Sequence, residues 1–219
     1  MTDFALARRN MVDGQLRPNR VTNAALLAAL SELPREKFLP EAVRSVAYAD
    51  EDVPLGAGRY LMEPMVLARL IQTLQPQSED RALVVGAGRG YGAALLARLV
   101  KAVAAVESDP ALATAGEQTV KDLGLTGVQW VVGKLEQGAP GPAPYDVILI
   151  EGAIRQVPQA IFDQLVEGGR LAVIVAGAAG AMGVAQIFVK DGGVTSGRPL
   201  FEAGTPLLPG FAPPPRFTF

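Results

Sequence analysis

The 219-residue sequence contains no cysteine and no histidine. The lack of cysteine excludes disulfide bonds, thiolate nucleophiles and thiolate zinc sites. The lack of histidine excludes catalytic triads with a histidine base, and it also excludes histidine metal sites. Any proton transfer in this protein must therefore use a carboxyl group, a lysine, a tyrosine or water.

Charged residues are also few, at 19%, and the net charge is only −2. Because no basic cluster stands out, we expect neither nucleic acid nor a membrane surface as a partner. The N-terminus carries Asp3 and has no apolar run after Arg8 and Arg9, unlike a secretory signal. The longest apolar stretch, near 171–175, is too short to span a bilayer. These features predict a cytoplasmic protein and leave its oligomeric state open.

The first third of the chain is predicted to be mainly helical. Helices are expected over 4–16, over 23–33 with Thr22 or Asn23 as the cap, and over 64–74, where Pro64 suits a helix start. Residues 48–60 are acidic and interrupted by glycine and proline, which is typical of an extended loop. We therefore expect residues 1–60 to form a helical segment packed on a core domain of residues 61–219, within one globular unit.

From residue 81 onward, short apolar runs alternate with helical segments. Strands are predicted at 81–85, 102–106, 128–132, 147–150 and 171–175, with helices at 91–99, 109–123 and 158–165. This alternation predicts an α/β fold with a parallel sheet and right-handed crossovers. Two further apolar runs, 184–189 and 194–201, flank Asp191-Gly192-Gly193 and predict a closing antiparallel hairpin.

A glycine-rich turn follows the first predicted strand and opens a helix. Its residues are Gly86, Ala87, Gly88, Arg89 and Gly90. Glycine lets a ligand approach the backbone, and the start of a helix offers free N–H groups. Glu107 ends the next strand, 107 − 86 = 21 residues on, where a carboxylate can bind both ribose hydroxyls of a nucleotide-type cofactor. The alternatives are a plain tight turn and a solvated strand-end glutamate.

The cofactor class is not settled by this spacing. Residues 88–93 also match the G-x-G-x-x-A pattern of NAD-binding proteins. The predicted hairpin argues against NAD, because no second mononucleotide-binding half follows the first. Both classes therefore remain open at this point.

Several segments resemble the protein-L-isoaspartate O-methyltransferase family over nearly the whole chain. They are AALSELPREKFLP at 28–40, AYAD at 47–50, VPLG at 53–56, the glycine turn at 86–91, YDVI at 145–148 and EGGRL at 167–171. The resemblance implies a Rossmann-like class I methyltransferase fold with a mostly parallel seven-stranded sheet that ends in an antiparallel hairpin. It also implies S-adenosyl-L-methionine as cofactor and methyl esterification of isoaspartyl carboxylates in damaged proteins, a repair reaction. The implied cofactor-binding residues are Gly86, Ala87, Gly88, Gly90, Glu107, Lys134 and Leu135.

The sequence departs from that family's pattern at three places. Val84 replaces an acidic residue before the glycine turn, and Lys134 replaces the aspartate that contacts the adenine. Lysine cannot accept the hydrogen bond of an adenine amino group. Met62 stands at the position of a serine near the reacting methyl group, although methionine is also a common packing residue. Met62, Glu63 and Glu151 are therefore the candidate residues for the methyl-transfer site.

The acceptor follows less directly from the sequence. A carboxylate is already ionised at neutral pH and needs no base, so the lack of histidine does not count against esterification. Met62 donates no hydrogen bond and Glu63 adds a negative charge, so we expect weak or absent isoaspartyl esterification. The competing possibility is that Arg59 supplies the donor and Glu63 faces solvent.

Other functions remain open besides esterification. An amine or hydroxyl acceptor, on a protein, a peptide or a small molecule, would need Glu63 or Glu151 as base. The chain could also be a binding module that has kept the fold without catalysis. An NAD-dependent oxidoreductase is the least favoured reading.

Overall fold

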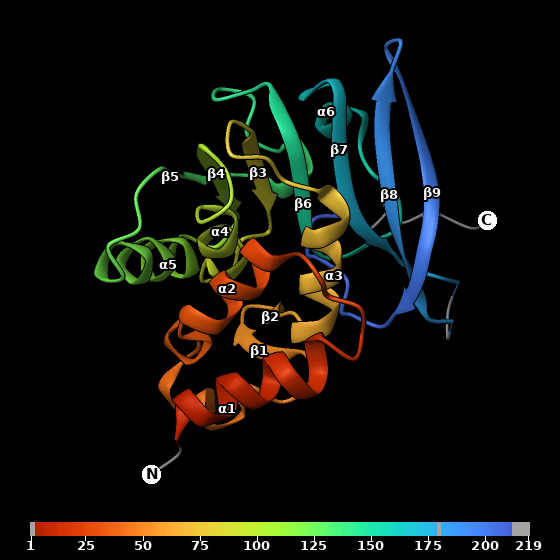
Figure 1. The fold of residues 1–219 in the computed structure, drawn as a ribbon. Coiled ribbons are helices and arrows are strands. Elements are labelled where there is room, and N and C mark those ends of the chain that lie inside the picture. The colour runs from red at the N-terminus through yellow and green to blue at the C-terminus, as the bar shows by residue number, and fades with distance from the viewer. Residues whose placement is uncertain (1–2, 179–180, 212–219) are drawn as a thin grey trace, which may run out of the picture.

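The computed structural model describes residues 3–178 and 181–211 (Figure 1). Its centre is a seven-stranded sheet with the strand order β5-β4-β3-β6-β7-β8-β9. The first five strands of this order are parallel to one another. β8 pairs antiparallel with β7, and β9 pairs antiparallel with β8. The strands are β3 (Arg81–Val85), β4 (Ala102–Glu107), β5 (Val128–Val132), β6 (Tyr145–Ile154), β7 (Leu165–Val175), β8 (Gly183–Asp191) and β9 (Val194–Ala203). The predicted parallel sheet with a closing antiparallel hairpin is thereby confirmed.

Alternate residues of the strands enter two apolar clusters, one on each face of the sheet. On one face, Val84 packs with residues of α3 (Pro64–Leu74), α4 (Tyr91–Leu96) and α5 (Pro110–Asp122). On the other face, Leu83 and Val85 pack with residues of α6 (Gln159–Phe162) and with Leu208 from the segment that follows β9. Burial on both faces explains why these strands are continuously apolar in the sequence.

The N-terminal segment is helical and lies at one end of the sheet (Figure 1). It contains α1 (Phe4–Met11), a π-helical turn over Val12–Leu16, α2 (Ala24–Glu32) and two 3₁₀ segments, Arg35–Phe38 and Glu41–Val46. The Asn23 side chain caps α2 by accepting a hydrogen bond from the Leu26 N–H at 2.9 Å, which removes one unpaired donor of the first turn. Within the described ranges, we find no helix of a length and apolarity that would cross a membrane.

The structure corrects three of the predicted elements. The predicted loop over 48–60 contains an antiparallel pair, β1 (Val53–Gly56) and β2 (Arg59–Leu61), in which Val53 lies opposite Leu61. The predicted helix over 158–165 is only α6, because β7 already begins at Leu165, where it pairs with Tyr145 of β6. The predicted helix over 4–16 changes to π-helical geometry at Val12. These differences arise from strand pairing and local geometry that neighbouring residues do not reveal.

Candidate active site

The glycine turn sits at the carboxyl end of β3 and leads into α4. Gly86, Gly88 and Gly90 all have positive φ, at 75°, 55° and 88°. The N–H groups of Gly86 and Ala87 both donate to the Val106 carbonyl of β4, at 2.9 and 3.1 Å. A Cβ added to Gly88 would lie 2.8 Å from Leu55 Cδ1. Glycine is therefore required at Gly88 by both the left-handed backbone and the close neighbour.

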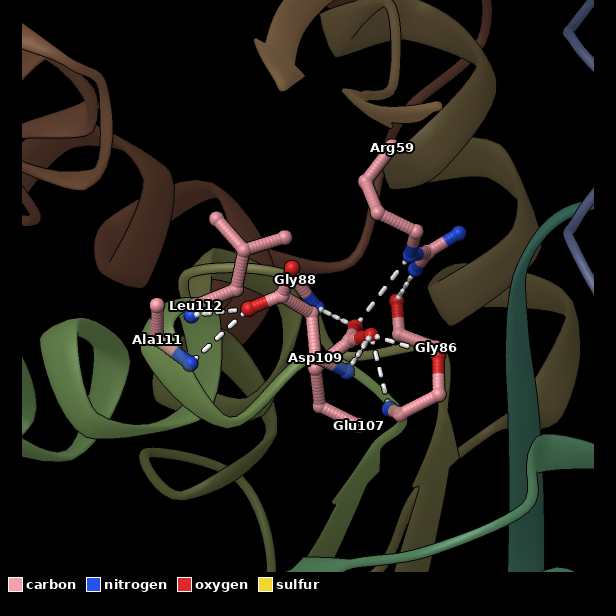
Figure 2. Close-up of polar contacts among 8 residues, drawn as sticks. Arg59, Gly86, Gly88, Glu107, Asp109, Ala111 and Leu112 are labelled. Carbon is pink, nitrogen blue, oxygen red and sulfur yellow. Dashed lines mark hydrogen bonds and ion pairs between the residues drawn. The ribbon is translucent and has the colours of Figure 1, made fainter. Parts of the chain in front are cut away.

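Glu107 ends β4 directly beside this turn, and its side chain is fully buried. Its Oε2 accepts a hydrogen bond from the Gly88 N–H at 2.7 Å, and its Oε1 accepts from the N–H groups of Ser108 at 2.8 Å and Asp109 at 3.2 Å (Figure 2). Asp109 in turn caps α5. Because Glu107 is buried and bonded, the alternative of a solvated strand-end glutamate is wrong.

Arg59 provides the positive charge that balances Glu107. Its side chain reaches from β2 into the crevice, where only 2% of it is exposed, and its Nε lies 3.2 Å from Glu107 Oε2. The guanidinium also donates to the Gly86 carbonyl (Figure 2). The sequence suggested Arg59 only as a donor to the acceptor. The pairing with Glu107 was missed because 48 residues separate the two.

Glu151 is a second buried carboxyl group at the carboxyl ends of the strands. It lies in β6 and is 3% exposed, and its Oε1 has no hydrogen-bond partner among residues 3–178 and 181–211. Burial raises the pKa of Glu151 to about 8, although the charges of Arg59 and Arg35 oppose this shift. A Cβ on Gly92 would overlap Glu151 Oε1, so the carboxyl group packs against the start of α4. At neutral pH, Glu151 is therefore mainly a neutral acid that can donate a hydrogen bond.

A narrow hollow lies between Arg59, Met62, Glu151 and the segment that follows β9. Its cavity volume is only about 10 Å³, far below the roughly 300–1,000 Å³ of pockets for drug-sized ligands. Leu208 closes it from the side of the segment after β9, where its N–H donates to the Ala153 carbonyl at 2.8 Å. The site is therefore closed in this conformation.

The structure separates the roles of Met62 and Glu63. Met62 is 1% exposed and borders the hollow, and its carbonyl accepts a hydrogen bond from the buried Arg35 at 2.5 Å. Glu63 is half-buried outside the hollow's lining, and its N–H donates to Asp52 Oδ1 at 2.8 Å. Burial, together with the nearby charges of Asp50 and Asp52, raises the pKa of Glu63 to about 7. The negative charge expected at Glu63 is thus only partly present at neutral pH.

Comparison with known proteins identifies the family. The sequence model of the protein-L-isoaspartate(D-aspartate) O-methyltransferase family matches residues 7–200. The chain is 40% identical over 164 residues to a protein-L-isoaspartate O-methyltransferase of Methanoculleus marisnigri, covering 75% of this chain and 74% of the relative. It is 39% identical over 175 residues to one of Roseiflexus sp., covering 80% of each. This chain belongs to the protein-L-isoaspartate O-methyltransferase family.

Solved structures agree with this assignment. A structure named protein-L-isoaspartate O-methyltransferase superposes with a TM-score of 0.82 and is 27% identical, covering 93% of this chain and 67% of that chain. A candidate protein-L-isoaspartate O-methyltransferase from Plasmodium falciparum, in complex with S-adenosyl-L-homocysteine, has a TM-score of 0.76. It is 18% identical and covers 96% of this chain and 100% of that one. The predicted Rossmann-like class I methyltransferase fold is thereby confirmed.

S-adenosyl-L-methionine is the cofactor of this family, and the crevice contains the chemical groups that would bind it. The glycine turn offers close backbone approach, and Glu107 offers a carboxylate beside it, as ribose binding requires. The space itself is taken by protein side chains, because a Cβ on Gly86 would lie 2.6 Å from Arg59 Nη2 and 3.1 Å from Leu208 Cδ2. The cofactor therefore fits this site only if Arg59 and Leu208 move aside.

The remaining predicted cofactor contacts lie on the loop that follows β5. Gly133 donates its N–H to the Glu107 carbonyl at 3.0 Å, which holds this loop at the same edge of the sheet. Lys134 is exposed, whereas Leu135 is buried in the same apolar cluster as Leu208. Val84 is fully buried within the sheet and offers no polar group. The structure thus places the glycine turn and Glu107 together and leaves Lys134 at the surface.

Proposed function

We propose that this protein is an S-adenosyl-L-methionine-dependent methyltransferase that esterifies isoaspartyl carboxylates in proteins or peptides, a repair reaction expected in the cytoplasm. The observation that carries the proposal is the buried carboxylate of Glu107 beside the glycine turn, in a chain of this family. In this proposal, the backbone of Gly86, Gly88 and Gly90 and the carboxylate of Glu107 hold the cofactor. When bound, the cofactor supplies a methyl group on a sulfonium sulfur.

The protein's own residues have a limited chemical task in this reaction. The acceptor carboxylate is already ionised, so the site must orient it, offer donors and exclude water. Met62 and Leu208 provide apolar walls around the hollow. Glu151, in its neutral form, offers a hydrogen-bond donor there. These features support esterification without a histidine base.

A second candidate function is methyl transfer to a hydroxyl or an amine, with Glu151 as the base. It is favoured by the Glu151 Oε1, which has no hydrogen-bond partner in the described part of the chain, and by the pKa of about 8, which suits proton abstraction near neutral pH. The pH dependence separates the two functions. As a donor to a carboxylate, Glu151 supports activity that falls as the pH rises through about 8, whereas as a base it supports activity that rises over the same interval.

Calorimetric titration with S-adenosyl-L-homocysteine tests the cofactor site. Removing the Glu107 carboxylate leaves the ribose hydroxyls without their acceptor. Because hydrogen bonds to charged groups contribute about 1.5–3 kcal/mol, Glu107→Ala should weaken binding roughly 10- to 150-fold. Glu117→Ala, on an exposed position of α5, is the matched control and should bind like the wild type. Absence of binding heat for the wild type at millimolar ligand would refute the proposed site.

A further inference from the structure

Arg59 occupies an unusual position for a buried cation. Its guanidinium lies in the crevice at Glu107 and Gly86 (Figure 2), and it also borders the hollow that contains Glu151. A guanidinium removed from water needs an anionic partner, because an unpaired buried charge is strongly destabilising. In the closed conformation that partner is Glu107.

Binding of the cofactor would change this pairing. The ribose hydroxyls and Arg59 compete for the same carboxylate, since Oε2 of Glu107 already accepts from both Gly88 and Arg59. A displaced Arg59 must then find another anion. Glu151 already lies near Arg59, whose charge lowers its pKa, yet no hydrogen bond or ion pair joins the two in residues 3–178 and 181–211.

The carboxylate of the methyl acceptor, in turn, needs a positively charged partner. This carboxylate approaches a site whose rim is acidic, because Asp52 lies beside Thr205 of the hollow and Asp50 and Asp52 act on Glu63. The other buried cation here, Arg35, already donates to the carbonyls of Ala47 and Met62. An arginine fork can bind a carboxylate through two parallel hydrogen bonds.

We propose that Arg59 binds the carboxylate of the methyl acceptor. In the cofactor-free protein Glu107 pairs with Arg59, and on cofactor binding the ribose hydroxyls take the place of Arg59 at Glu107. This inference rests on the proposed function. It implies ordered binding, in which the cofactor releases Arg59 and thereby creates the acceptor site. By thermodynamic linkage, the acceptor must then also tighten cofactor binding by the same factor.

Calorimetry on the full chain tests this exchange with S-adenosyl-L-homocysteine and an isoaspartyl peptide as probes. In the wild type, the peptide should bind more tightly when the cofactor product is present. Arg59→Gln removes the competitor for Glu107 and should bind S-adenosyl-L-homocysteine roughly tenfold more tightly or better, while peptide binding weakens by roughly 10- to 100-fold. Arg59→Lys keeps the positive charge but not the two-pronged guanidinium. Its affinities for both probes should therefore lie between those of the wild type and of Arg59→Gln.

Arg98→Gln is the matched control, because the Arg98 side chain is exposed and pairs at the surface with Glu32 at 3.8 Å. It should leave both affinities unchanged, and thermal unfolding of each variant verifies that it folds. If Arg59→Gln binds the cofactor product no more tightly than the wild type, or binds the peptide equally well, the proposal is overturned. If the variant does not fold, Arg59→Lys decides, and wild-type affinities there for both probes overturn the proposal.

Failure of the proposed function has a different signature. The wild type would then bind S-adenosyl-L-homocysteine but neither bind nor esterify the isoaspartyl peptide. The cofactor titration of Arg59→Gln still tests the displacement in that case, and unchanged or weaker binding overturns it.

Discussion

The Glu151→Gln substitution should make the protein more stable than the wild type in a pH-dependent way. Burial raises the pKa of Glu151 from its ordinary value of 4.5 to about 8. A carboxyl group whose pKa is raised by folding contributes fully to stability below its unfolded pKa, and this contribution is lost as the pH rises through the folded pKa. The loss therefore falls between about pH 4.5 and pH 8.

The magnitude follows from the size of the shift. At roughly 1.4 kcal/mol for each pH unit, the rise of the Glu151 pKa from 4.5 to about 8 corresponds to at most about 5 kcal/mol of unfolding free energy. Glutamine has the same shape and never ionises, so it should escape this loss while keeping a donor in the hollow. The free energy of unfolding of Glu151→Gln, measured relative to the wild type, should thus increase from pH 5 to pH 8.

Urea unfolding at pH 5, 6.5 and 8 measures this difference through the midpoint and slope of each transition. The exposed Glu117→Gln should show no such trend, because its side chain lies on the surface of α5. A difference between Glu151→Gln and the wild type that stays constant across this range would show that Glu151 ionises normally, and the reasoning about its neutral form would be refuted.

Two further predictions concern the departures from the family pattern. Lys134→Asp should tighten S-adenosyl-L-homocysteine binding, because aspartate can accept from the adenine amino group and lysine cannot; unchanged or weaker binding in calorimetry would show that the adenine is held in another way. The double change Met62→Ser with Glu63→Gln tests the expectation of weak esterification. A rise of 10²–10³ in turnover would support it, since one donor at the reacting group can contribute that much. Unchanged turnover would instead favour Arg59 as the donor.

Much of the sheet could be predicted because its signals are local. The buried run of β3, the largely apolar run of β5 and the proline at the start of α3 each define their element within a few residues. The pair β1 and β2 could not be predicted, because strands of four and three residues show too little alternation. The early start of β7 depends on pairing with β6, which is a tertiary contact.

The same distinction applies to the candidate site. Gly86, Gly88 and Glu107 were found because spacing along one βαβ unit brings them together. The pairing of Arg59 with Glu107 and the cover that Leu208 forms over Gly86 join distant parts of the chain. No local pattern signals such contacts, and they decide whether the crevice is open.

The most direct test of the proposed function is a methyl-ester assay with labelled S-adenosyl-L-methionine and two peptides that differ only in an isoaspartyl or an aspartyl residue. The account predicts base-labile label on the isoaspartyl peptide that accumulates slowly, because Met62 donates no hydrogen bond, together with little label on the aspartyl peptide and a strong loss with Glu107→Ala. Absence of label on the isoaspartyl peptide, from wild-type protein that binds S-adenosyl-L-homocysteine, would contradict the account.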